Sequence, residues 1–420
     1  MKIFVLSLTL KPYNVASLCG AKYVGYLMAP PFSQIEYNSR AQRVRDAMRN
    51  QNLDALIIGN PDNINWLTGY DAWSFYTPQL MLIDLNDNGL FWFGREMDAG
   101  AAKFTTYLSD QQIIGYPEKY VQTPLTHPSR YISDWMKNSG YEGSVIGLET
   151  DSYFTSLRSI NHLKSNLDNI KWCDADLLIN WVRVIKSEAE IAMMHQAAVI
   201  SDKAMKTAYE GTSVGVRQCD LMADIIATQI KGTKEFGGDM PALHPLILAG
   251  ESASTAHPLW TDAKLEPEQT IAFELGGCRK RYNVGLARTV HLGKKKPKKL
   301  INTAEAVTEG MHAIMDTLRS DITTGEIHRV WQSILDSYGL EKKSRIGYSI
   351  GVGYSPDWGE QTLSFRENEK TIVPKNAIVH IILGMWMDGW GMELSETLHV
   401  QERRSVRLSQ FSQEVKLIGI

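Results

Sequence analysis

The chain has 420 residues, of which 44% are hydrophobic and 22% are charged, so it is long enough for two domains with full cores and has an ordinary globular composition. Its formal net charge of −3 gives no electrostatic reason to expect a nucleic-acid partner. No stretch approaches the ~20 apolar residues that a membrane span needs. The cysteines include no Cys-x-x-Cys pair, which favours a cytoplasmic protein over a disulfide framework or a zinc site.

Residues 1–30 are predicted to be an N-terminal extension, and three interpretations of it stay open. The apolar residues 3–10 resemble the core of a signal peptide, but Lys11 and Pro12 end the run early and no clean cleavage site follows. In a second interpretation translation begins at Met28. In a third, the extension packs on the first domain.

Residues 31–183 are predicted to form an α/β domain, because segments with helical periodicity alternate with short apolar runs. A turn is predicted at residues 61–63, which read Pro-Asp-Asn. The predicted helices cover residues 34–50, 129–137 and 154–163, and the predicted strands cover residues 53–59, 80–84, 89–93, 145–149 and 170–175.

The second predicted domain covers residues 184–420. It begins with a long amphipathic helix over residues 186–209, because apolar residues there can share one helix face. Ser187 and Glu190 form a capping-box pattern at its start. Residues 405–420 are predicted to pack along the surface.

Glu274 is the leading catalytic candidate. It is a single carboxylate within an apolar strand, Ile-Ala-Phe-Glu-Leu, and such a group is costly to bury unless it is paired. Burial would raise its pKa and a nearby cation would lower it. A carboxylate of this kind suits nucleophilic or general-base work on a cationic substrate, although a structural carboxylate bonded to backbone amides is the alternative.

His257 and Glu396 are further catalytic candidates. His257 ends a loop of small residues and could transfer protons near neutral pH, although a single His is more often a structural donor. Glu393 and Glu396 lie three positions apart on a predicted strand, so they face opposite sides and at most one of them faces a site. We expect Glu396 to be that residue and Glu393 to be a solvated strand residue.

Several aromatic side chains are candidates for substrate binding. Tyr348 and Tyr282 carry phenols that could hydrogen-bond a ligand. A dense aromatic cluster in the first domain includes Trp73 and Tyr76, and it is either core packing or a wall over a cationic ligand.

The segments around residues 273–290, 346–351 and 391–396 resemble, in order and spacing, the motifs of the creatinase/prolidase/methionine aminopeptidase superfamily. In its metal-dependent members these segments supply two Asp, one His and two Glu to a pair of metal ions. The five corresponding positions in this chain read Glu274, Gly285, Tyr348, Ile382 and Glu396. Two Glu are too few for such a pair of ions, which favours a metal-free reaction.

Within this superfamily the chain is similar to the ectoine hydrolases. The similarity covers about residues 31–400, and its motifs include residues 65–76, residues 278–282, the Ser-Pro-Asp-Trp-Gly-Glu run that ends at Glu360, and residues 386–391. The resemblance implies a creatinase-like N-terminal domain followed by a pita-bread catalytic domain, with α/β (α+β) content, in a homodimer that needs no cofactor. It also implies opening of the cyclic amidine of ectoine to an N-acetyl-2,4-diaminobutyrate.

The same resemblance implies roles for single residues. Glu274 would attack or activate at the amidine carbon, while Glu396 or His257 would handle the proton of the ring nitrogen and the hydrolytic water. Arg288 is a candidate for binding the substrate carboxylate or for a structural pair with a Glu, and Glu360 is a candidate for binding the small zwitterionic substrate. Ala287 stands where creatinase has a second catalytic Glu, which argues against creatine.

Three alternatives stay open at the level of the sequence. A metal-dependent Xaa-Pro peptidase is disfavoured by the missing ligands. Another metal-free C–N hydrolase or lyase of the same fold, acting on a related osmolyte, is compatible with the same residues. For the ectoine hydrolase itself, the sequence does not distinguish ectoine from 5-hydroxyectoine. A non-catalytic binding protein is the third, and it would not need Glu274, His257 and Glu396 together.

Overall fold

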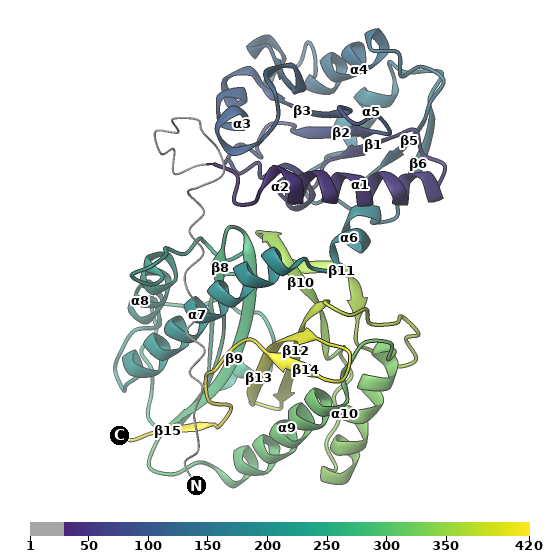
Figure 1. Ribbon diagram of the computed structural model, residues 1–420. Coiled ribbons are helices and arrows are strands. Elements are labelled where there is room, and N and C mark those ends of the chain that lie inside the picture. The colour runs from purple at the N-terminus through teal and green to yellow at the C-terminus, as the bar shows by residue number, and fades with distance from the viewer. Residues whose placement is uncertain (1–28) are drawn as a thin grey trace, which may run out of the picture.

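The computed structural model describes residues 29–420, which form two β-sheets, each with its own helices (Figure 1). The expectations for residues 1–28 lie outside the described residues. The first sheet has six strands in the order β4-β3-β2-β1-β5-β6. Its elements are α1 (Gln34–Asn50), β1 (Ala55–Ile58), α2 (Pro61–Thr68), β2 (Leu80–Asp84), β3 (Leu90–Arg95), α3 (Ala99–Thr105), β4 (Ile113–Tyr116), α4 (Pro128–Asn138), β5 (Val145–Leu148), α5 (Leu157–Lys164), β6 (Lys171–Asp174) and α6 (Leu178–Arg183).

The prediction of a turn at residues 61–63 is wrong, because α2 begins there. Asn60 caps the helix by accepting a hydrogen bond from the backbone N–H of Asp62. Pro61 occupies the first helical position, where its missing N–H costs nothing. Gly69 ends the helix in the left-handed conformation at φ 82°. A proline at a helix start and a proline in a turn look alike in the sequence.

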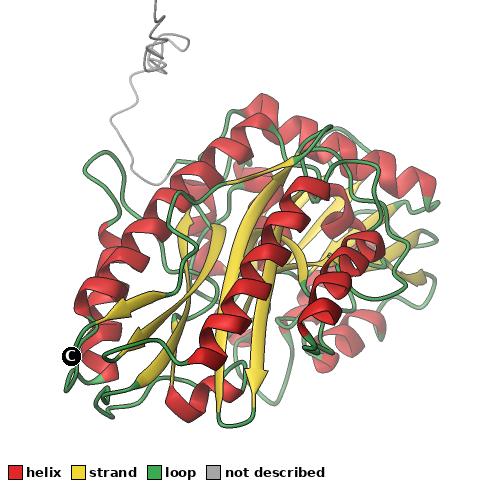
Figure 2. Cartoon of the chain, turned by 90° about the horizontal axis from the view of Figure 1, so that it is seen from below, coloured by secondary structure: helices red, strands yellow, loops and turns green. Residues whose placement is uncertain are grey.

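The second sheet has nine strands, seven of them in the order β14-β13-β12-β10-β9-β8-β7, while β11 pairs with β10 and β15 pairs with β9. Long helices lie across the outside of these strands (Figure 2). The elements are α7 (Glu188–Gly211), α8 (Gln218–Lys231), β7 (Leu246–Ala249), the 3-10 helix η5 (Gly250–Ser254), β8 (Gln269–Arg279), β9 (Tyr282–Leu292), α9 (Lys298–Thr317), α10 (Thr324–Tyr338), β10 (Gly347–Tyr354), β11 (Asp357–Ser364), β12 (Ile378–Met387), β13 (Trp390–Val400), β14 (Ser405–Arg407) and β15 (Lys416–Ile418).

Two long hairpins dominate this sheet, β8–β9 and β12–β13. In the second hairpin Gly384 lies opposite Glu393 and Ile381 lies opposite Glu396. The predicted capping box of α7 is confirmed, since Ser187 and Glu190 each accept from the other's backbone N–H. The two halves of the chain share one apolar cluster that includes Trp66 from α2 and Val352 from β10.

The C-terminal segment joins the sheet as well as packing on it. β14 pairs with β13, and β15 runs parallel to the end of β9. Within residues 29–420 no helix combines the length and the apolar character that crossing a membrane requires.

Candidate active site

A cavity of about 1010 Å³ lies among β8, β10 and β12. It brings together three of the residues predicted from the sequence: Glu274, His257 and Tyr348. The other predicted site residues do not line it. Its remaining lining is formed by Ala242, Leu243, His244, Leu246, Ala256, Leu259, Glu341, Lys342, Lys343, Ser344, Arg345, Ser355, Pro356, Asp357, Trp358, Ile382, Gly384, Met385 and Trp386.

Glu274 enters the cavity because of the alternation of β8. Phe273 and Leu275 point to the opposite face and belong to an apolar cluster under α7 and α8. Glu274 is 3% exposed, and burial raises its pKa to about 7. No side chain or backbone group among residues 29–420 donates a hydrogen bond to its carboxylate. A carboxylate with this pKa is present in both protonation states near neutral pH.

Tyr348 and Trp358 form one wall of the cavity. The indole N–H of Trp358 donates to the phenol oxygen of Tyr348 over 2.9 Å. Burial and then the charge of Glu274 raise the pKa of Tyr348 well above its ordinary value, so the phenol keeps its proton. With its oxygen accepting from Trp358, Tyr348 has an O–H free to donate to a ligand.

Two cationic side chains also line the cavity, those of Lys342 and Arg345. The ammonium group of Lys342 donates to the carbonyl of Gly384 over 2.7 Å and lies 4.7 Å from the ring centroid of Trp386. Burial lowers the pKa of Lys342 to about 8. The guanidinium of Arg345 lies 4.5 Å from the ring centroid of Tyr348. His257, at the mouth of the cavity, is exposed.

The side chains present do not fit the pair of metal ions that the superfamily implies. A side chain at Gly285 would meet the rings of His380 at 2.7 Å and Trp358 at 3.0 Å, so these rings fill the place of one ligand. Ile382 contributes only apolar atoms to the cavity. Among residues 29–420 no group of three or more His, Cys, Asp or Glu side chains could hold a metal ion together.

Glu396 and Arg288 lie on the far side of the sheet from the cavity. The guanidinium of Arg288 lies 2.7 Å from a carboxylate oxygen of Glu396, and both side chains are wholly buried. Arg288 also donates to the backbone carbonyls of Ser395 and Ser412. Arg288 and Glu396 are paired with each other away from the cavity. A direct role of Glu396 in proton transfer, or of Arg288 in substrate binding, therefore does not fit this structure.

Glu393, expected to be solvated, is buried instead, and this expectation was wrong. It faces the side of β13 opposite to Glu396, as the alternation of a strand requires. Burial raises its pKa well above the ordinary value, and the charge of Glu274 raises it further. Of the two carboxylates, Glu393 lies opposite the cavity-lining Gly384, although its own side chain does not line the cavity. The prediction that Glu396 is the one on this side was wrong.

Tyr282 also lies outside the cavity. Its hydroxyl donates to Glu190 over 2.9 Å, in a buried cluster where Glu190 also accepts from the indole N–H of Trp66. The guanidinium of Arg40 lies 3.8 Å from Glu190. Tyr282 thus joins the two halves of the chain instead of facing a ligand.

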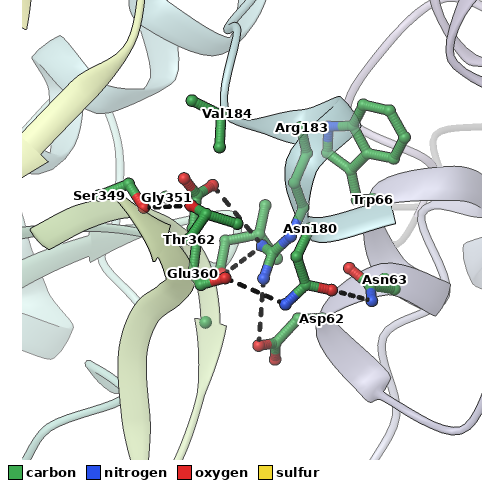
Figure 3. Close-up of polar contacts among 12 residues, drawn as sticks. Asp62, Asn63, Trp66, Asn180, Arg183, Val184, Ser349, Gly351, Glu360 and Thr362 are labelled. Atoms are coloured by element: carbon green, nitrogen blue, oxygen red, sulfur yellow. Dashed lines mark hydrogen bonds and ion pairs between the residues drawn. The ribbon is translucent and has the colours of Figure 1, made fainter. Parts of the chain in front are cut away.

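Glu360 belongs to a second buried cluster between the halves (Figure 3). One of its oxygens accepts from Lys186 over 2.6 Å, and the other lies 3.9 Å from Arg183. Arg183 in turn lies 3.6 Å from Asp62 of α2 (Figure 3). Glu360 is therefore placed as a structural counter-charge, away from the large cavity.

Trp73 and Tyr76 do not line the large cavity either. They are 81% and 60% exposed, so neither is core packing. The hydroxyl of Tyr76 accepts from Arg95 over 3.0 Å beside a smaller cavity of about 390 Å³. Within this chain they form no wall over the carboxylate of Glu274.

Comparison with known families assigns both halves of the chain. Residues 40–185 match the creatinase/prolidase N-terminal domain, and residues 192–402 match metallopeptidase family M24. These matches confirm the predicted fold class, a creatinase-like domain followed by a pita-bread domain.

Curated relatives and solved structures agree with this assignment. The chain is 39% identical to an uncharacterized hydrolase/peptidase of Sinorhizobium fredii over 88% of this chain and 94% of that protein. It is 34% identical to the ectoine hydrolase of Halomonas elongata over 92% of this chain and 98% of that protein. Among solved structures, the prolidase of Thermococcus sibiricus has a TM-score of 0.79 at 17% identity, over 92% of this chain and 100% of that chain. The chain therefore belongs to metallopeptidase family M24, with a creatinase/prolidase N-terminal domain, and is a hydrolase that acts on carbon–nitrogen bonds.

Proposed function

We propose that this protein opens the cyclic amidine of ectoine, or of 5-hydroxyectoine, to an N-acetyl-2,4-diaminobutyrate without a metal ion. The observation that carries the proposal is the buried carboxylate of Glu274, which faces the cavity with no hydrogen-bond donor from the described residues. Such a group favours a cationic ligand that supplies the missing counter-charge. The similarity to the ectoine hydrolase of Halomonas elongata supports the same substrate.

The reaction follows from the charge of the substrate. Ectoine is a zwitterion that carries a delocalised amidinium, and its amidinium carbon is electrophilic without a Lewis acid. In the proposed reaction, ionised Glu274 attacks this carbon, or draws a water molecule onto it. The ring C–N bond breaks and the leaving nitrogen takes a proton, for which His257 is the candidate donor because it lines the same cavity. Water supplies the oxygen of the resulting acetamide.

The substrate's carboxylate needs a cation that lines the same cavity. Arg345 and Lys342 are the candidates, because both line the cavity and neither forms an ion pair among the described residues. Arg345 is held against the ring of Tyr348, and its planar guanidinium can bind a carboxylate with two hydrogen bonds. This assignment replaces Arg288 in the binding of the carboxylate.

Replacing Arg345 with Gln is expected to raise KM for ectoine about 10- to 100-fold, since a hydrogen bond to a charged group contributes about 1.5–3 kcal/mol. The value of kcat should change much less, because the carboxylate lies away from the reacting carbon. Steady-state kinetics measures both. Arg366→Gln, at an exposed arginine outside the cavity, is the matched control. An unchanged KM in Arg345→Gln would move the assignment to Lys342.

The substrate itself is tested by incubating the purified protein with ectoine and following the products by mass spectrometry. We expect a product heavier than ectoine by one water molecule. A panel of Xaa-Pro dipeptides tests the peptidase alternative, and cleavage of these without turnover of ectoine would overturn the proposal.

We also propose that the protein works as a homodimer, as the resemblance to the ectoine hydrolases implies, and in the cytoplasm, as the absence of a Cys-x-x-Cys pair favours. Analytical ultracentrifugation of the full chain tests this assembly, and a single monomeric species at assay concentrations would contradict it.

A further inference from the structure

Glu393 approaches Glu274 through the contact between the two long hairpins. The hydroxyl of Thr289, on β9, donates to the backbone carbonyl of Glu393 over 2.9 Å and accepts from its backbone N–H over 2.8 Å. Two positions on, Ser395 accepts from the backbone N–H of Ala287 over 2.6 Å. Ala287 lies directly opposite Glu274 in the β8–β9 hairpin. Glu393 therefore belongs to the face of β13 that covers the strand beside Glu274.

The carboxyl group of Glu393 has no partner of its own. Both of its oxygens are buried, and neither has a hydrogen-bond partner among residues 29–420. It does not line the cavity, so it is not placed to touch a substrate. An ionised carboxylate in such a place is strongly disfavoured, and burial together with the charge of Glu274 raises the pKa of Glu393 well above its ordinary value, which favours the protonated form.

The two groups are complementary in hydrogen bonding. A protonated Glu393 has an O–H with no acceptor, while an ionised Glu274 has acceptor oxygens with no donor from the described residues. Two neighbouring carboxyl groups in a dry site cannot both ionise, so such pairs hold a single proton and a single negative charge.

We propose that Glu393 is a positioning residue that shares one proton with Glu274 and keeps one oxygen of Glu274 ionised toward the cavity. The shared proton moves between an O–H bond on Glu393 and an O–H bond on Glu274. The pair therefore keeps one proton and one negative charge throughout. The inference rests on the proposed function for the reaction that this charge serves.

Other titratable groups surround the pair. Tyr348 on β10 faces Glu274, and its phenol stays protonated. His380 on β12 has a pKa of about 3, lowered by burial and by the charge of Arg288, so it stays neutral. Lys342 faces Glu393 and has a pKa of about 8. Lys342 is therefore the group whose titration could be mistaken for that of the pair.

The test compares pH profiles of kcat/KM for two variants. In the wild type the profile should rise as the pair loses its first proton and fall as it loses the second. Glu393→Gln keeps a hydrogen-bond donor, so its acid limb should stay in place while the alkaline limb of the pair disappears. Glu393→Met has no donor, so its acid limb should move to higher pH. Glu266→Gln, at an exposed glutamate outside the cavity, is the control and should keep both limbs.

Two outcomes of the kinetics would overturn the inference. An acid limb that moves to lower pH in both variants would mean that Glu393 is ionised and merely repels Glu274. Unchanged profiles in both variants would mean that its role is structural. Lys342→Met decides whether an alkaline limb that survives in Glu393→Gln belongs to Lys342.

Infrared difference spectroscopy of the substrate-free protein separates this inference from the proposed function. At about pH 8.5, where Glu274 with its pKa of about 7 is mostly ionised, the wild type should carry a buried protonated carboxyl band that is absent in Glu393→Gln. A wild type without this band overturns the inference, whether or not ectoine is the substrate.

Discussion

Replacing Glu274 with Gln is expected to reduce kcat on ectoine by several orders of magnitude, as for the loss of a catalytic nucleophile or base. Gln keeps the size of the side chain and removes its charge and its basicity. Affinity for the substrate should fall as well, because the amidinium loses its counter-charge. Single-turnover and steady-state kinetics separate the two effects.

The same variant should be more stable than the wild type at pH 8, which shows that the loss of activity is not a loss of fold. Burial raises the folded-state pKa of Glu274 to about 7, above its unfolded value, so its contribution to stability is fully present below pH 4.5 and is lost as the pH rises through about 7. Gln has no such dependence. Glu266→Gln, at an exposed Glu outside the cavity, should change neither activity nor stability. Near-normal turnover in Glu274→Gln would refute its role and move the assignment to His257.

Replacing Arg288 with Met is expected to lower the free energy of unfolding by about 3–5 kcal/mol, because it removes the nearest and best-buried cation from the charge of Glu396 and leaves it, among the described residues, only Arg407 at 3.6 Å. The lost side chain also bonds several backbone carbonyls that connect β13 to the C-terminal segment. Urea unfolding followed by circular dichroism measures the change. The folded fraction of the variant should keep an almost normal KM for ectoine.

Two further variants sharpen this prediction. Combining Arg288→Met with Glu396→Leu removes both charges and should recover part of the lost stability. Arg217→Met breaks an exposed ion pair with Asp220 and should cost less than about 1 kcal/mol. A large rise in KM with unchanged stability in Arg288→Met would instead restore Arg288 as a ligand for the substrate carboxylate.

The sequence predicts local features of the fold well, because they depend on neighbouring residues. The helix predicted over residues 34–50 is observed as Gln34–Asn50, and the strand predicted over residues 80–84 as Leu80–Asp84. The capping box of α7 is likewise local. The prediction of a turn at Pro61 is wrong because Pro61 begins a helix. The burial of that helix, which is seen only in three dimensions, decides between a turn and a helix.

The residues of the candidate site likewise divide into those with a local signal in the sequence and those without one. Glu274 is recognisable in the sequence as a charge within an apolar strand, and it does face the cavity. Choosing between Glu393 and Glu396 requires the register of the β12–β13 hairpin, which a tight turn at Asp388 and Gly389 fixes. That turn was a usable signal, since it places Glu393 opposite Gly384. The partners of Arg288 and Tyr282 come from distant segments and carry no local signal.

Lys342 and Arg345 are two cavity residues that could not be predicted from the sequence. They lie in a charged segment between α10 and β10 that looks like an ordinary solvated loop in the sequence. Their approach to the cavity depends on the rings of Trp386 and Tyr348, which belong to β12 and β10. Such cation–ring contacts between segments appear only when the strands are placed in space.

Metal-independent turnover of ectoine is the central claim, and it is tested most directly on protein treated with EDTA, freed of the chelator and analysed for metals. We expect substoichiometric Zn, Mn, Co and Fe, unchanged turnover of ectoine after this treatment, and no stimulation when any of these ions is added back. About two metal ions per chain, with activity lost to EDTA and restored by one of the ions, would contradict the account.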